Sequence, residues 1–125
     1  MRYKLEVNEE QLRLISESLD VCSRIRCGQL GTIRELFYTK EFNRESFDYA
    51  IKQLKIILFP KLVSGEYYGI YGDKTPMESK IGYDIYKNIN HKLNRSGDIW
   101  NVNKDPHTHL ASGIDCVVEE MEDEK

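Results

Sequence analysis

Long apolar runs and leader-like segments are missing from this sequence of 125 residues. The longest purely apolar run, residues 56–59, has four residues, whereas a helix that crosses a bilayer needs roughly 20. The first six residues lack the apolar core of a secretory signal peptide. We therefore expect a cytoplasmic chain with no membrane partner.

Cysteine is scarce, and its number is odd. Cys22, Cys27 and Cys116 cannot all pair with one another, which is typical of a reducing compartment rather than of a secreted disulfide scaffold. A catalytic thiolate needs neighbours that lower its pKa. Arg24 and Arg26 lie one or two positions from cysteines on a predicted helix, where side chains do not face each other. We expect buried thiols, and with no carboxylate pair that stands out, no enzyme.

An excess of charge of one sign occurs only at the C-terminal end. The chain has 18 basic and 21 acidic residues, a formal net charge of −3. Residues 119–125 hold five acids and one base, which leaves 17 bases and 16 acids in residues 1–118. A run of like charges favours a solvated, disordered segment. We predict a single globular domain over 1–118 and an acidic disordered tail over 119–125, with an interaction tail as the alternative.

Capping signals predict the first half of the fold. Asn8, with Gln11 three residues later, forms a capping box that begins a helix, and Gly28 ends it. Thr32 with Glu35 is a second capping box. It begins a short segment that is either a separate helix or a continuation of the first.

The second half has equally local signals. Asn43 begins a helix that Pro60 ends, because the residue before a proline avoids the helical region. Residues 61–74 form a loop. The last helix begins at Thr75-Pro76-Met77-Glu78, with Thr75 as N-cap and Pro76 at the first helical position, and it runs to about Leu93.

Short alternating segments predict strands near both ends of the chain. The candidates are residues 3–7, 99–102 and 114–118, and the last could pair with the first. The predicted fold is therefore mainly α (α+β). It is a small bundle of three to four helices with a short N-terminal strand that could pair with a C-terminal strand.

Metal and nucleic-acid binding have little support. His107 and His109, with His91 and Cys116 as further candidates, do not have the tight paired spacings of zinc ligands. Positive charge is dispersed among acids, and its densest piece is Arg24-Ile25-Arg26, so the basic patch of a nucleic-acid-binding protein is missing. We expect no metal, no cofactor and no nucleic-acid partner.

Two clusters suit a small anionic or nucleotide-type ligand, which needs cations for phosphate, aromatic faces for a base and amides for directional hydrogen bonds. The second cluster lies on the last helix, and its alternative interpretation is a solvated helix face whose tyrosines cover the edges of the core. The loop tyrosines Tyr67, Tyr68 and Tyr71 form either a lid or an ordinary surface loop. The candidate ligand-binding residues are Arg24, Arg26 and Gln29 at the end of the first helix and Tyr83, Tyr86, Lys87, Asn90 and His91 on the last.

Two segments of the chain resemble a known set of proteins when taken together. One is residues 5–12, leading into Ser23-Arg24 and Gly28-Gln29, and the other is residues 82–93. Their order resembles that of small proteins encoded by tailed bacteriophages and prophages, in which the second segment is a Tyr-Asp helix that ends in Arg-His. Here Asn90 stands in place of that arginine, so a phosphate contact is not carried over to this position.

The resemblance implies a phage accessory protein made in the bacterial cytoplasm. Some small phage proteins counter host defence as sponges, which are oligomers that enclose a cyclic or ADP-ribose-derived nucleotide signal without cleaving it. On this hypothesis the chain is a non-enzymatic homo-oligomer with pockets at or near its subunit contacts. The two arginines would neutralise phosphate, Tyr83 or Tyr86 would stack on a base, and Gln29 and His91 would donate or accept hydrogen bonds.

Two other functions stay open at this stage. The main alternative is a protein-binding module that blocks a host factor through a helical face or the acidic tail. A hydrolase without a familiar motif is the third.

Overall fold

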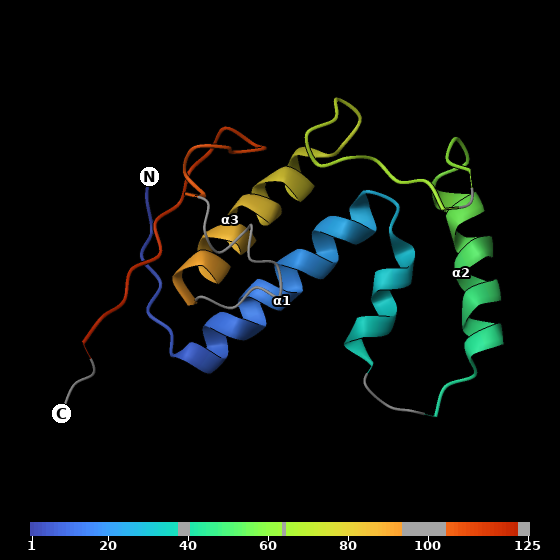
Figure 1. The fold of residues 1–125 in the computed structure, drawn as a ribbon, viewed down its shortest axis with the longest axis horizontal. Helices are drawn as coiled ribbons and strands as arrows, with labels where there is room; N and C mark the ends of the chain where they lie inside the picture. The colour runs from blue at the N-terminus through green and yellow to red at the C-terminus, as the bar shows by residue number, and fades with distance from the viewer. Residues whose placement is uncertain (38–40, 64, 94–104, 123–125) are drawn as a thin grey trace.

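The computed structural model describes residues 1–37, 41–63, 65–93 and 105–122. Its described elements are α1 (Glu9–Arg26), the 3-10 helix η1 (Leu30–Leu36), α2 (Arg44–Leu58) and α3 (Met77–Leu93). Helices α1 and α3 lie side by side, and α2 stands apart from them beyond η1 (Figure 1). The predicted helical bundle is confirmed. None of the described helices is both long and apolar enough to cross a membrane.

Helix α1 has the N-terminal cap that the sequence predicts. The Asn8 side chain accepts a hydrogen bond from the Gln11 N–H at 2.8 Å, and the Gln11 side chain accepts one from the Asn8 N–H at 2.9 Å. The capping box thereby provides partners for two of the four N–H groups that have none within the helix at its start. At the other end Gly28, with φ of 98°, turns the chain out of the helix as the left-handed region permits for glycine.

The contact between α1 and α3 is built from small and polar residues. A Cβ added to Gly82 would lie 2.7 Å from the Ser23 Oγ, so the two helices approach closely at this glycine. Further along, the Ser16 hydroxyl donates to the Asn90 Oδ1 at 3.0 Å between buried side chains. This packing buries Val21 of α1 and Ile89 of α3.

Apolar residues spaced four apart form a stripe along α3, which begins at Met77 and includes Ile81, Ile85, Ile89 and Leu93. The buried face of α3 differs from the one that this stripe predicts. Ile89 is buried, but Met77 at the start of the stripe is exposed. Polar residues on the opposite side, including Asp84, Lys87 and Asn90, are buried. The reason is that Ser16 of α1 and the segment 105–116 supply hydrogen-bond partners to these buried polar groups.

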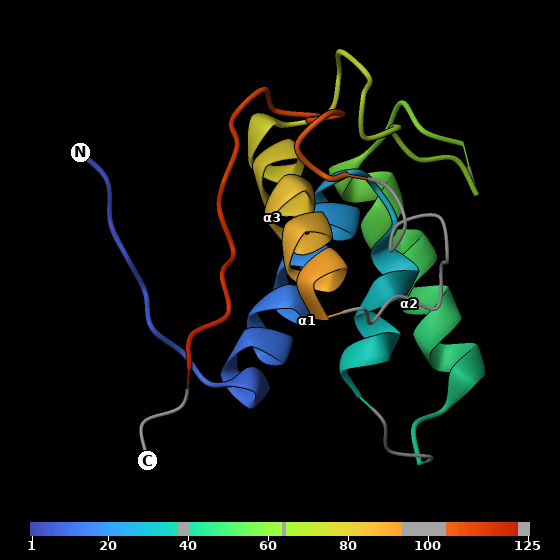
Figure 2. The same ribbon diagram turned by 60° about the vertical axis from the view of Figure 1, so that its left-hand side comes forward.

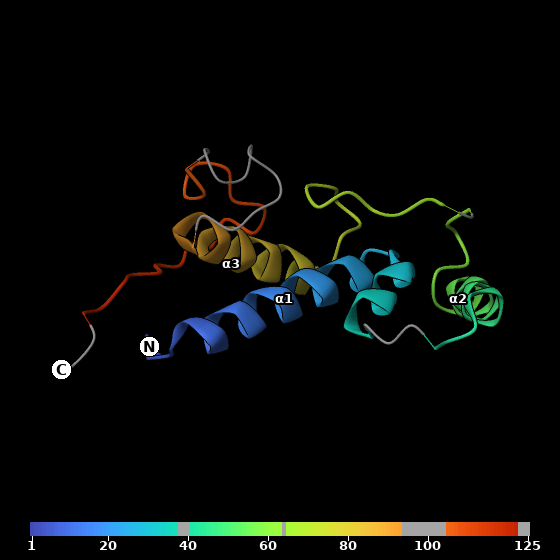
Figure 3. The same ribbon diagram turned by 60° about the horizontal axis from the view of Figure 1, so that its bottom comes forward.

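Helix α2 has the predicted bounds but little cover. Asn43 accepts a hydrogen bond from the Ser46 N–H at 3.0 Å, and the helix ends at Leu58, two residues before Pro60. None of its residues is buried. It packs beside η1 (Figure 2), and the view in Figure 3 shows it well separated from α1 and α3.

The predicted terminal strands are wrong for the residues that the structure describes. Residues 3–7 and 114–118 have no strand structure. Tyr3, Leu5, Ile114 and Val117 are all exposed, so neither segment has a sheet neighbour to bury its alternate side chains. An alternating pattern fits an extended chain, but a strand also needs a hydrogen-bonded partner. The third predicted strand, residues 99–102, lies outside the described residues.

Two predicted caps also differ from the structure. Thr32 lies inside η1 rather than before it, because η1 begins at Leu30 after the N-cap Gln29. Helix α3 begins at Met77, and the Pro76 carbonyl accepts from the Ser79 and Lys80 N–H groups. The Thr75 hydroxyl donates to the Gly69 carbonyl, which ties the preceding loop to the start of α3. Residues 119–122 of the acidic tail are exposed without regular structure, and disorder of the whole tail stays a prediction.

Candidate functional site

A pocket lies where the last turns of α1 meet α3 and the loop that follows α2. It contains about 200 Å³ of space and opens to the surface. This volume is below the roughly 300–1,000 Å³ of pockets that bury a drug-sized ligand. The pocket is therefore large enough for one ring and an adjoining polar group, and a larger ligand would extend outward.

The α1 wall of the pocket presents a positioned guanidinium. The Arg24 Nε donates to the Asp20 Oδ1 at 2.9 Å, and the Arg24 Nη1 donates to the Gln29 Oε1 at 3.3 Å. The hydrogen bond with Asp20 raises the pKa of Arg24 above its ordinary value, so the guanidinium keeps its charge. The Arg24 side chain remains 48% exposed, which leaves part of it accessible to a ligand. Ser23 and Cys27 complete this wall.

The chain after α2 reaches the pocket because Gly28 leaves room for it. A Cβ at Gly28 would lie 2.7 Å from the Leu62 Cδ1 and 3.8 Å from the Tyr67 Cα. The Tyr68 N–H donates to the Cys27 carbonyl at 2.8 Å. The Tyr68 ring packs edge-on against Phe59, with ring centroids 6.4 Å apart. The loop is thus fixed to the end of α1 on one side and to the end of α2 on the other.

Three tyrosines and one isoleucine form the remaining wall. Tyr67, Tyr68 and Ile70 come from the loop, and Tyr83 comes from the second turn of α3. Burial raises the pKa of the Tyr83 phenol, with further contributions from Tyr71 and Tyr86, so its hydroxyl stays neutral at neutral pH. The pocket therefore places the Arg24 guanidinium next to aromatic side chains.

Two neighbours on α3 support Tyr83 from outside the pocket lining. The Tyr86 ring centroid lies 6.2 Å from that of Tyr83, and the Lys87 Nζ lies 5.0 Å from the Tyr83 ring centroid. Lys87 is buried and donates to the His109 carbonyl at 2.8 Å. Its ammonium is therefore already engaged by the protein, in a cation–π arrangement behind the ring.

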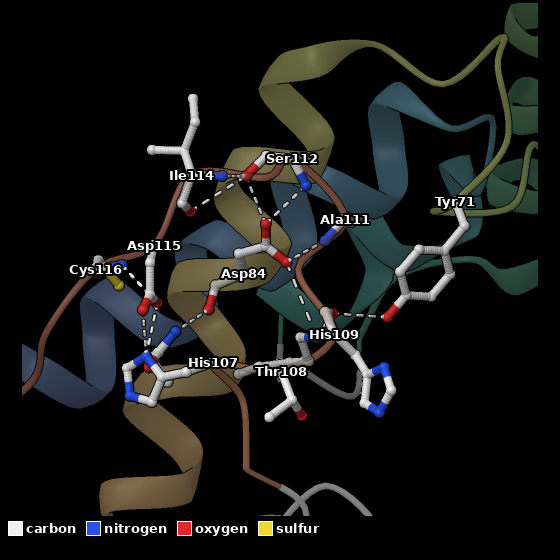
Figure 4. A network of polar contacts seen from close by, with 12 residues as sticks. Tyr71, Asp84, His107, Thr108, His109, Ala111, Ser112, Ile114, Asp115 and Cys116 are labelled. Carbon is white, nitrogen blue, oxygen red and sulfur yellow. Dashed lines mark hydrogen bonds and ion pairs between the residues drawn. The ribbon is translucent and has the colours of Figure 1, made fainter.

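The segment of residues 105–116, which we name the strap, is held on α3 by the carboxylate of Asp84 (Figure 4). Asp84 is 1% exposed and accepts hydrogen bonds from the Ala111 N–H at 2.9 Å, the Ser112 N–H at 2.8 Å and the Ser112 hydroxyl at 2.5 Å. The Tyr71 hydroxyl donates to the His109 carbonyl at 3.1 Å. Because Tyr71 belongs to the loop that lines the pocket, the strap connects this loop to α3.

The structure brings together three of the eight predicted ligand-binding residues. Arg24, Gln29 and Tyr83 line the pocket. Tyr86 and Lys87 lie behind Tyr83, as described above. The other three are not among the pocket-lining residues: Arg26, exposed on the last turn of α1; Asn90, bonded to Ser16; and half-buried His91.

Four residues that line the pocket have no sequence signal for ligand binding. Asp20, Ser23, Cys27 and Ile70 carry no pattern that distinguishes them from ordinary helix or loop residues. Tyr67 and Tyr68 do carry a signal, which is a tyrosine pair between Gly65 and Gly69 in a loop. That signal could suggest a functional loop, but not the helix end against which the loop packs.

The predicted metal-ligand candidates lie in the strap and on α3. The His107 Nδ1 lies 2.6 Å from the Asp115 Oδ2, and this pair is exposed. Within the described ranges of the chain, no three side chains of the His, Cys, Asp and Glu types come close enough to hold a metal ion. Burial, followed by the nearby carboxylates Asp115 and Asp84, raises the pKa of the Cys116 thiol, which disfavours a thiolate there.

Comparison of the chain with models of protein families, with curated proteins and with solved structures gives no significant match.

Proposed function

We propose that this protein binds and sequesters a small nucleotide-type ligand, cyclic or ADP-ribose-derived, without converting it chemically. The observation that carries the proposal is the pocket in which the accessible part of Arg24 lies next to the aromatic wall of Tyr67, Tyr68 and Tyr83. A nucleotide combines a phosphate with a planar base, and these are the groups that a guanidinium and aromatic faces recognise.

The charges of the pocket favour a phosphodiester over a terminal phosphate. Asp20 also lines the pocket and already balances the charge of Arg24. A phosphodiester carries one negative charge, whereas a terminal phosphate carries about −1.5 to −2 near neutral pH. The second charge would lie close to the Asp20 carboxylate. Cyclic nucleotides and cyclic dinucleotides, whose phosphates are diesters, are therefore the preferred class.

The biological setting of the proposal comes from the resemblance to phage and prophage proteins. On that basis the protein is an accessory factor in the cytoplasm of an infected bacterium, where it removes a nucleotide immune signal from solution. Sequestration requires high occupancy and an intact ligand, and it requires no catalytic group.

A thermal-shift screen of the ligand-free chain tests the proposal. Cyclic dinucleotides and cyclic ADP-ribose isomers are added singly, with linear mononucleotides bearing a terminal phosphate as the matched comparison. A ligand that binds only the folded state at 100 times its dissociation constant stabilises it by about 2.7 kcal/mol, which raises the melting temperature by several degrees. Chromatography after denaturation is expected to recover the ligand intact. If no cyclic nucleotide shifts the melting temperature, the proposal fails, and recovery of a cleaved product would indicate a hydrolase.

A protein-binding module is the second candidate function. It is favoured by the exposed apolar side chains of α2, such as Ile56 and Ile57, which could contact a host factor. Deletion of residues 119–125 would distinguish a contact through the acidic tail from a contact through a helical face. A host factor that still binds after this deletion would have to contact a helical face rather than the tail.

A further inference from the structure

The hydroxyl of Ser23 on α1 is buried without a partner. Ser23 is 3% exposed, and within the described part of the chain its Oγ makes no hydrogen bond. A serine inside a helix ordinarily either points its hydroxyl to water or donates it to the carbonyl four residues earlier, and Ser23 does neither. Because buried polar groups are nearly always paired, this unpaired hydroxyl requires a physical explanation.

The packing of α1 against α3 explains the burial of this hydroxyl but gives it no partner. The Ser23 Oγ lies against Gly82, where an added Cβ would be only 2.7 Å away, and a glycine has no side chain that donates or accepts a hydrogen bond. Ser16, about two turns earlier on the same helix, is buried to a similar extent. Its hydroxyl does have a partner in α3, because it donates to the Asn90 Oδ1 at 3.0 Å.

Ser23 also lines the pocket, at its buried end. It follows Asp20 by three residues and precedes Cys27 by four, so these three lining residues share one face of α1. Ser23 is almost fully covered, whereas the Arg24 side chain is 48% exposed. Ser23 therefore lies at the floor of the pocket, and Arg24 lies toward its mouth.

A ligand that reaches the floor of the pocket would supply the missing partner. If the phosphate of a nucleotide meets Arg24 at the mouth, its base extends inward between the tyrosines to Ser23. The edges of all bases carry donors and acceptors, and a hydroxyl can serve as either. We propose that Ser23 is a ligand-binding residue, whose hydroxyl turns about the Cα–Cβ bond from Gly82 to the edge of the base. The turn is a change between staggered positions, and the role rests on the proposed function.

A ligand-binding role for Ser23 predicts opposite effects of one substitution on stability and on affinity. The unpaired hydroxyl destabilises the ligand-free chain, and it gains a partner only in the complex. Ser23→Ala should therefore raise the melting temperature of the ligand-free chain by several degrees. The same substitution should weaken ligand binding about 5-fold or more. Replacement of a serine with only a structural role would lower the melting temperature and leave the affinity unchanged.

Ser16→Ala is the matched control, because it makes the same change at another buried serine of α1. Alanine favours the helix equally at both positions, so this contribution cancels in the comparison. Ser16→Ala removes the hydrogen bond to Asn90 and leaves the Asn90 Oδ1 unpaired, so the melting temperature should fall by several degrees. Ser16 is not among the described residues that line the pocket, so the affinity for a ligand should be unchanged.

Melting curves of the ligand-free variants, and calorimetric titrations with cyclic di-adenylate, cyclic di-guanylate and cyclic ADP-ribose, test the role of Ser23. Weaker binding by Ser23→Ala together with a higher melting temperature supports this role. Equal affinities of the wild type and Ser23→Ala overturn it and leave the proposed function intact. An unchanged or lower melting temperature of ligand-free Ser23→Ala also overturns it, because the hydroxyl would then be satisfied within the fold. If the wild type binds none of the three nucleotides, the proposed function and the role of Ser23 fail together.

Discussion

The substitution Asp84→Asn should cost the fold several kcal/mol. Asp84 is 1% exposed, accepts three hydrogen bonds from Ala111 and Ser112, and lies 3.9 Å from the buried Lys87 ammonium. Asparagine keeps the shape but turns one oxygen into an NH₂ group that faces N–H or O–H donors. The NH₂ group replaces either Oδ1, which accepts one of these hydrogen bonds, or Oδ2, which accepts two. The loss of one or two hydrogen bonds to a charged group amounts to about 1.5–6 kcal/mol, and removal of one partner of a buried ion pair costs about 3–5 kcal/mol. We expect about 3–5 kcal/mol, a large part of the 5–15 kcal/mol that stabilises a domain.

Urea unfolding and amide hydrogen exchange measure this loss in two ways. Exchange at the Ala111 and Ser112 amides should accelerate most, because both donate to Asp84. Asp115→Asn is the matched control, since its exposed pair with His107 should contribute no more than about 1 kcal/mol. Adding Lys87→Met to Asp84→Asn should recover part of the lost free energy of unfolding, because it removes a buried ammonium that no longer has a carboxylate partner. Equal losses for Asp84→Asn and Asp115→Asn would refute the account of the strap.

Three further predictions follow from single contacts. Gly82→Ala should destabilise by about 1–2 kcal/mol in urea unfolding, because its Cβ would lie 2.7 Å from the Ser23 Oγ. In a Ser23→Ala background, Gly82→Ala should instead raise the free energy of unfolding by up to about 1 kcal/mol. A change of the same sign in both backgrounds would argue against the clash. Exposed Cys22 should react with Ellman's reagent before Cys116, whose thiol pKa is raised by burial, and the reverse order would contradict this. Burial raises the pKa of the Tyr83 phenol in the folded chain, so the unfolded chain loses the phenol proton at a lower pH. The free energy of unfolding should therefore fall from about pH 10 upward. Tyr83→Phe should flatten that slope, and an unchanged slope would show that the phenol is not buried.

The elements of the fold that depend on local chemistry could be predicted from the sequence. The Asn8–Gln11 capping box and the end of α2 before Pro60 each involve a few neighbouring residues. The terminal strands could not be judged locally, because a strand exists only if another segment pairs with it. The exposed ends in the structure supply no such partner among the described residues.

The buried polar side of α3 shows why tertiary partners decide burial. Lys87 and Asn90 belong in water by their chemistry, but the His109 carbonyl and the Ser16 hydroxyl provide them with partners in the interior. Likewise, the end of α1 could be recognised as a candidate site from Arg24 and Gln29. The arrival of Tyr67 there depends on the close approach at Gly28, which no spacing in the sequence reveals.

Calorimetric titration with a cyclic dinucleotide, comparing Arg24→Ala with Arg26→Ala, tests the central claim most directly. Both arginines lie in the last turn of α1, but only Arg24 lines the pocket. We predict binding by the wild type, nearly unchanged binding by Arg26→Ala, and binding weakened at least about 10-fold by Arg24→Ala, in line with about 1.5–3 kcal/mol for a hydrogen bond to a charged group. Equal affinities for the two variants, or no heat with any cyclic nucleotide, would contradict the assignment of this pocket as a nucleotide site.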